Sequence, residues 1–216
     1  MIIDCIADLH GNYPDLEGGD LLIVAGDLTA GDAFPEYVGF FNWLRRQRYR
    51  RKVLVAGNHD NHLLRLYTIP EEETDLSYLC DSGTEFEGLK IWGSPWTKSF
   101  PGMNPHCKAF TLDTEEELAE KWALIPDDTD ILITHSPPYG ILDRVDFSED
   151  DSSAINVGST SLAKFVGARV KPPRFWIWGH IHESYGFKTS FLTQYVNASH
   201  VNGHYQPVNK PIRIEL

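Results

Sequence analysis

The amino-acid sequence predicts an α/β fold, a two-sheet sandwich flanked by helices. The first observation is a series of short apolar runs that each end at a glycine or a polar residue, such as Val53–Ala56 before Gly57. Runs of this length and ending are typical of buried strands in an α/β sheet. The second observation is that helical patterns separate the early runs, whereas hairpin-like strands follow later. Parallel βα units combined with later hairpins favour two packed sheets with helices outside them.

Composition and charge limit the class of protein. The chain has 216 residues, 42% of them hydrophobic, so we expect one domain over residues 1–216 with a substantial core. Its 31 acidic and 19 basic residues give a net charge of −12, which argues against broad electrostatic docking on nucleic acid or anionic lipid. An anionic substrate remains compatible with this charge, because bound cations can invert the local field.

Targeting signals and cysteines predict the compartment. The sequence contains no apolar run of membrane-spanning length and no amino-terminal signal pattern, so we expect a cytoplasmic protein without a membrane partner. Cys5, Cys80 and Cys107 are odd in number and lack CxxC spacing. We therefore expect reduced thiols rather than a zinc-thiolate site.

The first half of the chain alternates predicted strands and helices. The predicted strands are Ile2–Ala7, Leu21–Ala25 and Val53–Ala56, then Ser77–Cys80, Thr84–Phe86 and Lys90–Trp92. Apolar residues at helical spacing predict a helix over Pro35–Arg51, and its arginine-rich end suits the carboxyl end of a helix dipole. A second helix is predicted around Leu63–Tyr67.

The second half begins with a predicted loop, Gly93–Cys107, whose length is typical of binding loops. A helix is predicted over Thr114–Ala123, because Thr114 and Glu117 form a capping-box pattern and Pro126 follows. Pro137–Ser153 is predicted to be a loop, and Thr160–Ala168 a short helix. The remaining predicted strands are Ile131–Thr134, Phe175–Trp178, Tyr185–Phe187, Thr193–Ala198 and Pro211–Glu215.

Five of the predicted strands are followed at once by aspartate, asparagine or histidine. These polar residues are Asp8 and His10, then Asp27, then Asn58, His59 and Asp60, then His135, and finally His180 and His182. The carboxyl ends of strands are where open α/β sheets bind ligands. A buried strand needs only a turn after it, so the repeated choice of these residue types indicates one shared site.

The mixture of residue types in this set indicates a metal centre. Aspartate, asparagine and histidine together suit borderline divalent metals such as manganese, iron or zinc. Seven candidates are too many for one tetrahedral ion and fit two metals that share a carboxylate: Asp8, His10, Asp27, Asn58, His135, His180 and His182. Two metals roughly 3.5–4 Å apart can stabilise the attacking and leaving oxygens of a phosphoryl displacement. That leaves His59 to protonate the leaving group, with Asp60 holding its imidazole oriented and protonated.

The order of these blocks resembles the calcineurin-like metallophosphoesterase superfamily. The matching blocks are Asp8-x-His10, Gly26-Asp27, Gly57-Asn58-His59-Asp60, His135 and Gly179-His180-x-His182. Further segments are similar to the branch of metallophosphoesterase-domain-containing proteins, whose animal members are cyclic-nucleotide phosphodiesterases. Those segments are Ile91–Thr97, Trp122–Pro126 before Thr129–Leu132, Thr134–Gly140, Gly179–Gly186 and Val196–Ser199.

This resemblance implies a four-layer α/β/β/α sandwich of two mixed sheets, with a dinuclear metal site at the carboxyl ends of the strands. It implies that Asp8, His10 and His182 bind the first metal, that Asn58, His135 and His180 bind the second, and that Asp27 bridges them. A metal-bridging hydroxide would be the nucleophile, and His59 would stabilise the transition state or protonate the leaving group. Manganese is the expected metal, with iron and zinc as alternatives.

We therefore expect a metal-dependent phosphoesterase that hydrolyses cyclic nucleotides or other small phosphodiesters. The alternatives on the same centre are a nuclease and a nucleotide phosphomonoesterase, and the acidic charge argues against a processive nuclease and against a stable nucleic-acid partner. A non-catalytic scaffold with a metal-stabilised surface is a third alternative, disfavoured by the intact ligand set. The unmatched histidines are expected at the surface: His62, His106, His200 and His204.

Overall fold

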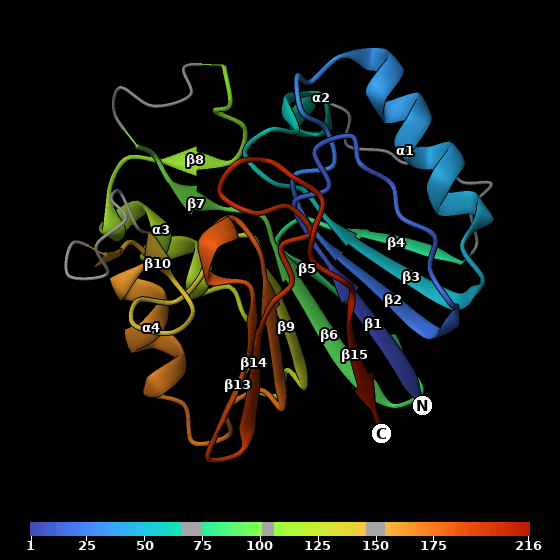
Figure 1. The fold of residues 1–216 in the computed structure, drawn as a ribbon. Helices are drawn as coiled ribbons and strands as arrows, with labels where there is room; N and C mark the ends of the chain where they lie inside the picture. Colours follow the sequence, from blue (N-terminus) through green and yellow to red (C-terminus); the bar gives the residue numbers. More distant parts are fainter. Residues whose placement is uncertain (66–74, 101–105, 146–153) are drawn as a thin grey trace.

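Two mixed β-sheets pack face to face at the centre of the molecule (Figure 1). The computed structural model describes residues 1–65, 75–100, 106–145 and 154–216. The first sheet has the order β15-β1-β2-β3-β4 and consists of β1 (Ile2–Ile6), β2 (Gly19–Ala25), β3 (Tyr49–Val55), β4 (Leu76–Leu79) and β15 (Ile212–Glu215). Strands β1 to β4 pair in parallel, and β15 is antiparallel to β1.

The second sheet has the order β13-β14-β12-β9-β6-β5. It consists of β5 (Ser82–Phe86), β6 (Leu89–Ser94), β9 (Ile131–Thr134), β12 (Phe175–Trp178), β13 (Gly186–Ser190) and β14 (Thr193–Asn197). Its four inner strands are parallel, and β5 and β13 pair with them in antiparallel fashion at the two edges. Two short two-stranded sheets are formed by β7 (Thr97–Lys98) with β8 (Thr111–Leu112) and by β10 (Arg144–Val145) with β11 (Ile155–Asn156).

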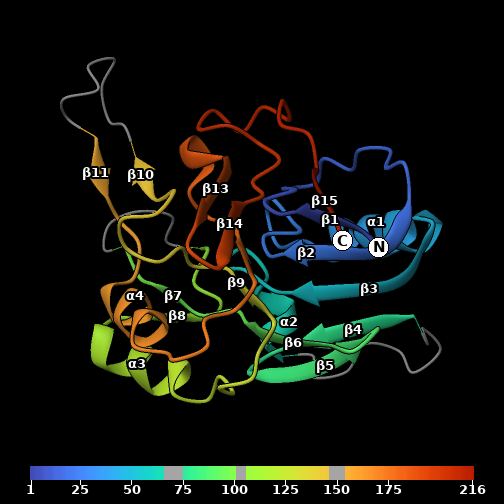
Figure 2. The same cartoon turned by 90° about the horizontal axis from the view of Figure 1, so that it is seen from below.

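Helices cover the outer face of each sheet, which confirms the predicted four-layer α/β/β/α sandwich. The helices are α1 (Phe34–Arg46), α2 (Asn61–Arg65), α3 (Glu115–Trp122) and α4 (Thr160–Gly167), with a 3-10 turn at His182–Ser184. Helix α1 lies outside the first sheet, whereas α3 and α4 lie outside the second (Figure 1). Seen from below, the two termini lie side by side where β15 meets β1 (Figure 2). Within the described residues, no helix has the length and apolar character needed to cross a bilayer.

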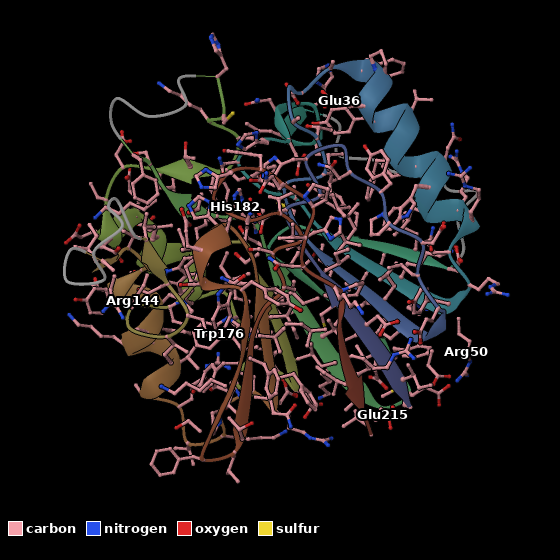
Figure 3. The ribbon with its side chains drawn as sticks, in the orientation of Figure 1. Glu36, Arg50, Arg144, Trp176, His182 and Glu215 are labelled. Atoms are coloured by element: carbon pink, nitrogen blue, oxygen red, sulfur yellow. The ribbon has the colours of Figure 1, made fainter. Side chains whose placement is uncertain are left out.

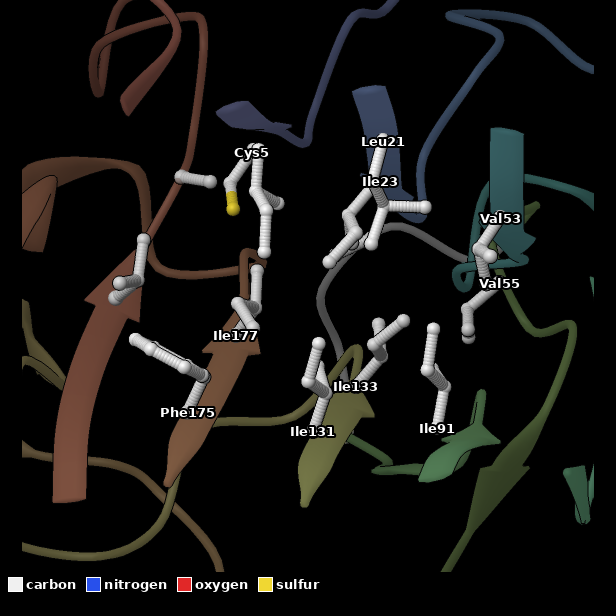
Figure 4. Close-up of a cluster of buried hydrophobic side chains, with 14 of the residues drawn as sticks. Cys5, Leu21, Ile23, Val53, Val55, Ile91, Ile131, Ile133, Phe175 and Ile177 are labelled. Atoms are coloured by element: carbon white, nitrogen blue, oxygen red, sulfur yellow. The ribbon is translucent and has the colours of Figure 1, made fainter. Parts of the chain in front are cut away.

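The apolar core lies in three layers that correspond to this architecture. Between the sheets, side chains from both inner faces interdigitate, including Cys5, Leu21, Ile23, Val53 and Val55 from the first sheet and Ile91, Ile131, Ile133, Phe175 and Ile177 from the second (Figure 4). Leu22 and Val24 point the other way and pack under Phe40 and Trp43 of α1. The third layer lies outside the second sheet, where Leu132 and Trp176 pack with Trp122 of α3 and Leu162 of α4. Because both faces of these strands are buried, their sequences are continuously apolar.

Helix α1 is shorter than the sequence predicts. The helix ends at Arg46, and Tyr49–Val55 forms β3 beside β2, so the prediction of a helix over Pro35–Arg51 is wrong at its carboxyl end. Tyr49 is buried, and its hydroxyl donates a hydrogen bond to the side chain of Asp4 in β1. Burial of this side chain and strand pairing outweigh the helical spacing, because tertiary packing overrides local propensity.

Other predicted elements are found close to their expected places. Helix α3 has the predicted capping box, in which the Glu117 N–H donates to Thr114 Oγ1 at 3.2 Å and the Thr114 N–H donates to Glu117 Oε2 at 3.0 Å. The predicted loop Gly93–Cys107 contains the end of β6 and the short strand β7, and its residues 101–105 lie outside the described residues. Parts of two other predicted elements also lie outside the described residues. These are residues 66–67 of the predicted helix Leu63–Tyr67 and residues 146–153 of the predicted loop Pro137–Ser153.

We predict that Gly93→Ala lowers the free energy of unfolding by about 1–3 kcal/mol, as overpacking of a core does. A Cβ at Gly93 would lie 2.4 Å from Leu79 Cβ and 2.8 Å from Val55 Cγ2, between the two sheets. Gly167→Ala is the matched control, because its added Cβ meets no atom within 4 Å and should be neutral or slightly stabilising. Urea unfolding of the three proteins measures the difference, and equal stability of Gly93→Ala and the unmodified protein would contradict the tight inter-sheet packing.

Candidate metal centre

The carboxyl ends of the parallel strands from both sheets meet at one edge of the sandwich. Side chains that follow β1, β2 and β3 approach side chains that follow β9 and β12. Figure 3 shows His182 near this edge, whereas Glu215 lies at the opposite end of the sheets. The structure brings all seven predicted ligands to this edge. They form two neighbouring groups there.

The first ligand group consists of Asp8, His10 and His182. Their potential ligand atoms all lie within 4.8 Å of one another. The Nε2 atoms of His10 and His182 are 3.2 Å apart, and His182 Nε2 is 3.7 Å from Asp8 Oδ1. The group therefore converges on one point, as the three protein ligands of a single ion would.

The second ligand group consists of Asp27, His135 and His180, with Asn58 beside them. The first three residues have ligand atoms within 4.8 Å of one another, and Asn58 Oδ1 lies 3.1 Å from His135 Nε2. Asp27 Oδ2 is 3.4 Å from His135 Nε2 and 3.8 Å from His10 Nε2. The Asp27 carboxylate thus belongs to the second group and also faces His10 of the first, so it can contribute an oxygen to both.

Hydrogen bonds at the outer nitrogens of the imidazoles leave lone pairs aimed inward. His135 Nδ1 donates to the Ala25 carbonyl at 2.9 Å, and His10 Nδ1 donates to the Thr29 carbonyl at 3.3 Å, because a carbonyl can only accept. In the neutral rings, Nε2 is then an acceptor that faces other acceptors. His180 Nε2 is buried and has no hydrogen-bond partner among the described residues. A buried hydrogen-bond acceptor without a donor is energetically costly. Divalent cations would satisfy these nitrogen and oxygen atoms, so the set fits a metal site.

Electrostatics at the centre keep its two carboxylates in the ionised form that binds metal. Burial would raise the pKa of Asp8, but the hydrogen bond and charge of His182, together with the charge of His135, lower it to about 2. Burial likewise opposes ionisation of Asp27, yet the charges of His135 and His59 hold its pKa well below the usual range. Both carboxylates are therefore anionic at neutral pH.

The imidazoles divide into two classes. Burial lowers the pKa of His10 to about 4 and that of His180 to about 3, so both rings are neutral at pH 7. Burial acts in the same sense on His135, but the charge of Asp27 outweighs it and raises the pKa to about 9. A cation at the second ligand group would displace this proton, because metal ligands must be deprotonated.

The backbone around the centre adopts conformations that are uncommon for side-chain-bearing residues. Asp8, His10, Asp27 and His180 all have positive φ, between 43° and 71°. Strain of this kind costs of order 1–3 kcal/mol per residue and persists where the surroundings determine it. Such clustering at the four ligand positions is what a functional centre produces.

Two glycines allow the backbone to approach the carboxylates. A Cβ at Gly57 would lie 2.2 Å from Asp27 Oδ1, and a Cβ at Gly179 would lie 2.3 Å from Asp8 Oδ2. Asp8 also accepts hydrogen bonds from the backbone N–H of His180 at 3.0 Å and from Ser199 Oγ at 2.5 Å. These contacts fix a residue after β1 against residues after β12 and β14, and so join the two sheets at the site.

His59 lies beside the Asp27 carboxylate. Its Nε2 is 4.0 Å from Asp27 Oδ2, its ring packs edge-to-face on His10 at 4.5 Å, and its backbone N–H donates to Asp27 Oδ1 at 2.9 Å. The ring Nδ1 donates to the Ala30 carbonyl at 3.0 Å. Nε2 is therefore the nitrogen that faces the centre.

Asp60 does not orient the His59 imidazole, and that part of the sequence-based prediction is wrong. The Asp60 carboxylate is fully buried and accepts hydrogen bonds from the N–H groups of Gly57 at 2.8 Å and Leu28 at 3.1 Å. Through these bonds Asp60 connects the turns after β2 and β3, while burial and the charge of Asp27 raise its pKa to about 8. Ala30 holds the imidazole instead, and Asp60 is a positioning residue for the turns.

Sequence reasoning missed or misplaced several residues near the centre. Phe100 stacks on His180 at 5.8 Å, and Cys107 Sγ lies 3.3 Å from His59 Nδ1. Both residues belong to the predicted binding loop Gly93–Cys107, but no pattern within it predicts these two contacts. His200 was expected at the surface, but it is only 6% exposed and its Nδ1 donates to the Asn209 carbonyl at 2.7 Å. The prediction for His106 and His204 is confirmed, because both are exposed.

A pocket of about 240 Å³ opens beside the ligands. Asn58, His180 and His182 form part of its wall. The other lining residues include Lys98, Phe100, Cys107, Val145, Val157, Glu183 and Tyr205. Its size suits a small molecule, and its position would place that molecule against both ligand groups.

Comparisons with known proteins identify a family and several similar chains. A family model described as calcineurin-like phosphoesterase matches residues 1–184. Metallophosphoesterase domain-containing protein 1 of Homo sapiens and that of Mus musculus are each 37% identical over 238 residues, which cover 98% of this chain and 70% of each relative. A UPF0046 protein of Caenorhabditis elegans is 30% identical over 233 residues, which cover 98% of this chain and 79% of that relative.

We predict that excess Mn²⁺ raises the melting temperature, because an ion that binds only the folded state stabilises it. At 100 times Kd, one site contributes about 2.7 kcal/mol, which corresponds to roughly 5–10 °C for a chain of this size. Asp27→Asn should remove most of the shift, since Asp27 serves both ligand groups. Asp128→Asn is the matched control, because Asp128 pairs with Lys90 at the surface. An undiminished shift in Asp27→Asn would contradict the shared carboxylate.

Proposed function

Since the chain belongs to the calcineurin-like phosphoesterase family, a family of metal-dependent phosphoesterases, we propose that it is a phosphodiesterase for cyclic nucleotides or other small phosphodiesters. This membership confirms the resemblance noted in the sequence. The observation that carries the proposal is the pair of ligand groups joined by Asp27 beside a pocket of about 240 Å³.

The ligand groups assign the residues that would hold the metals. Asp8, His10 and His182 would bind one cation, His135, His180 and Asn58 would bind the other, and Asp27 would serve both. When bound, two divalent cations would polarise the phosphoryl oxygens and lower the pKa of a water molecule. Manganese is our proposed metal, and iron and zinc are alternatives, because the mixed oxygen and nitrogen donors suit all three.

His59 is the residue that we assign to the leaving group. Its Nδ1 hydrogen is held by the Ala30 carbonyl, so the ring orientation is fixed and Nε2 faces the centre. Protonated at Nε2, the ring can donate a proton to the departing alkoxide, a role typically worth 10²–10⁴-fold in rate. The imidazole can also offset negative charge on the phosphoryl group in the transition state.

The pocket favours a small substrate over a polymer. Among its described lining residues, Lys98 is the one lysine or arginine side chain, and Glu183 carries the opposite charge. A nuclease that tracks a strand uses a groove with many cations, which is a different surface. This composition supports a small phosphodiester as the partner and speaks against a stable nucleic-acid partner.

The three unpaired cysteines support a cytoplasmic location.

A substrate panel tests the proposal directly. With Mn²⁺ added, we expect turnover of bis-p-nitrophenyl phosphate and of at least one cyclic nucleotide, and much slower turnover of a single-stranded oligonucleotide and of nucleoside monophosphates. Preference for the oligonucleotide would favour the nuclease, and preference for monophosphates would favour the phosphomonoesterase. Absence of turnover on every substrate by a Mn²⁺-loaded protein would instead favour the non-catalytic scaffold.

We predict that His59→Ala slows hydrolysis most for substrates with poor leaving groups. An alkoxide from a cyclic nucleotide needs a proton, whereas p-nitrophenolate leaves as an anion, so the loss in kcat should approach ~10²–10⁴-fold only for the cyclic nucleotide. His106→Ala is the matched control, since His106 is exposed and does not line the pocket. Equal losses on both substrates would show that His59 acts on the phosphoryl charge and not as the proton donor.

A further inference from the structure

The imidazoles of the two ligand groups differ in the hydrogen bonds that orient their rings, and His182 differs from His10 and His135. His10 and His135 donate their outer N–H to backbone carbonyls. Partners of this kind set the tautomer and orientation of a metal-binding imidazole, and their loss typically weakens metal binding 10–100-fold. Among the described residues, the ring of His182 has no carbonyl or carboxylate bonded to its outer nitrogen. Its hydrogen-bond contact is with His10 Nε2, on the metal side.

The ring of Tyr205 contacts the imidazoles of His10 and His182. It packs edge-to-face on His10, with centroids 4.9 Å apart and planes at 68°, and on His182, with centroids 5.1 Å apart and planes at 87°. One aromatic ring therefore touches both histidines of the first ligand group. Edge-to-face contacts at this spacing are favourable beyond the area that they bury.

Hydrogen bonds within the loop define the backbone around Tyr205. The Tyr205 N–H donates to the Asn202 carbonyl at 2.8 Å. The side-chain oxygen of Asn202 accepts the N–H groups of His204 and Gln206, each at 3.0 Å. Tyr205 itself has a φ of +59°, which is uncommon for a bulky residue and persists only where the surrounding structure determines it. Tyr205, which has this uncommon φ, is thus the residue whose ring contacts His10 and His182.

We propose that Tyr205 is a positioning residue for the first metal site, whose ring holds His10 and His182 so that both present Nε2 to one ion. The inference rests on the metal centre of the proposed function. Tyr205 lies beyond residues 1–184, the span that the family model matches, so the segment between β14 and β15 adds this element to the centre. Tyr205 also lines the pocket and is 46% exposed, which means that its ring can be removed without opening the core.

Calorimetric titration of Mn²⁺ into the metal-free protein tests this role without measuring turnover. The unmodified chain should bind two ions. Tyr205→Ala keeps the Cβ but loses the ring, and should bind one of the two ions about tenfold more weakly while the other is unchanged. Tyr205→Phe keeps the ring and should bind both ions as the unmodified chain does. Phe191→Ala removes an aromatic side chain that is 99% exposed and serves as the matched control.

The outcomes separate this inference from the proposed function. Unchanged binding of both ions by Tyr205→Ala would overturn the inference and leave the metal centre intact. A loss in Tyr205→Phe as large as in Tyr205→Ala would overturn it too, by assigning the effect to the hydroxyl. Failure of the unmodified chain to bind Mn²⁺, iron or zinc would contradict the proposed function itself. Should alanine lower the melting temperature of the metal-free protein, Tyr205→Leu, which keeps apolar bulk without a flat ring, makes the same comparison.

Discussion

The buried carboxylate of Asp27 is the charge around which the site is built. It is almost fully removed from solvent, with His10, His59 and His135 nitrogens between 3.4 and 4.0 Å from its Oδ2 atom. A buried anion must be neutralised by protons or cations, because desolvation of an unpaired charge is costly. In the metal-free protein the proton on His135 meets part of this need, and divalent cations would meet all of it. Metal binding at this residue would therefore be coupled to folding.

The two-sheet architecture explains how residues so far apart in the chain surround that charge. The inter-sheet core aligns the carboxyl ends of β1 to β3 with those of β9 and β12, and contacts at Asp8 then fix the two edges together. The close approach leaves no space for a side chain at Gly57 or Gly179. Positive φ at four ligand positions adds strain, and the packed sheets supply the stability that offsets it.

Much of the fold, and the set of side chains that would meet at one edge of the sheets, could be predicted from the sequence, because both depend on residue type and order. Apolar runs mark buried strands, and polar residues at their ends mark the site. What could not be predicted depends on tertiary contacts. The end of α1 is decided by burial of Tyr49, and the orientation of His59 by the Ala30 carbonyl, which any residue type at position 30 could supply. Phe100 and Tyr205 reach the ligands from loops whose paths no local pattern encodes.

The aromatic contacts also bear on how substrate and metal share one pocket. Phe100 packs on His180 of the second ligand group, Tyr205 packs on both histidines of the first, and both rings line the pocket beside the ligands. A molecule bound in the pocket would touch the same side chains that contact the histidines of the two ligand groups. Occupation of the pocket would restrict these rings further, and the rings in turn would restrict the histidines. Restricting the histidines in this way would favour metal binding, and because coupling between two ligands is reciprocal, bound metal would favour the molecule in the pocket by the same factor.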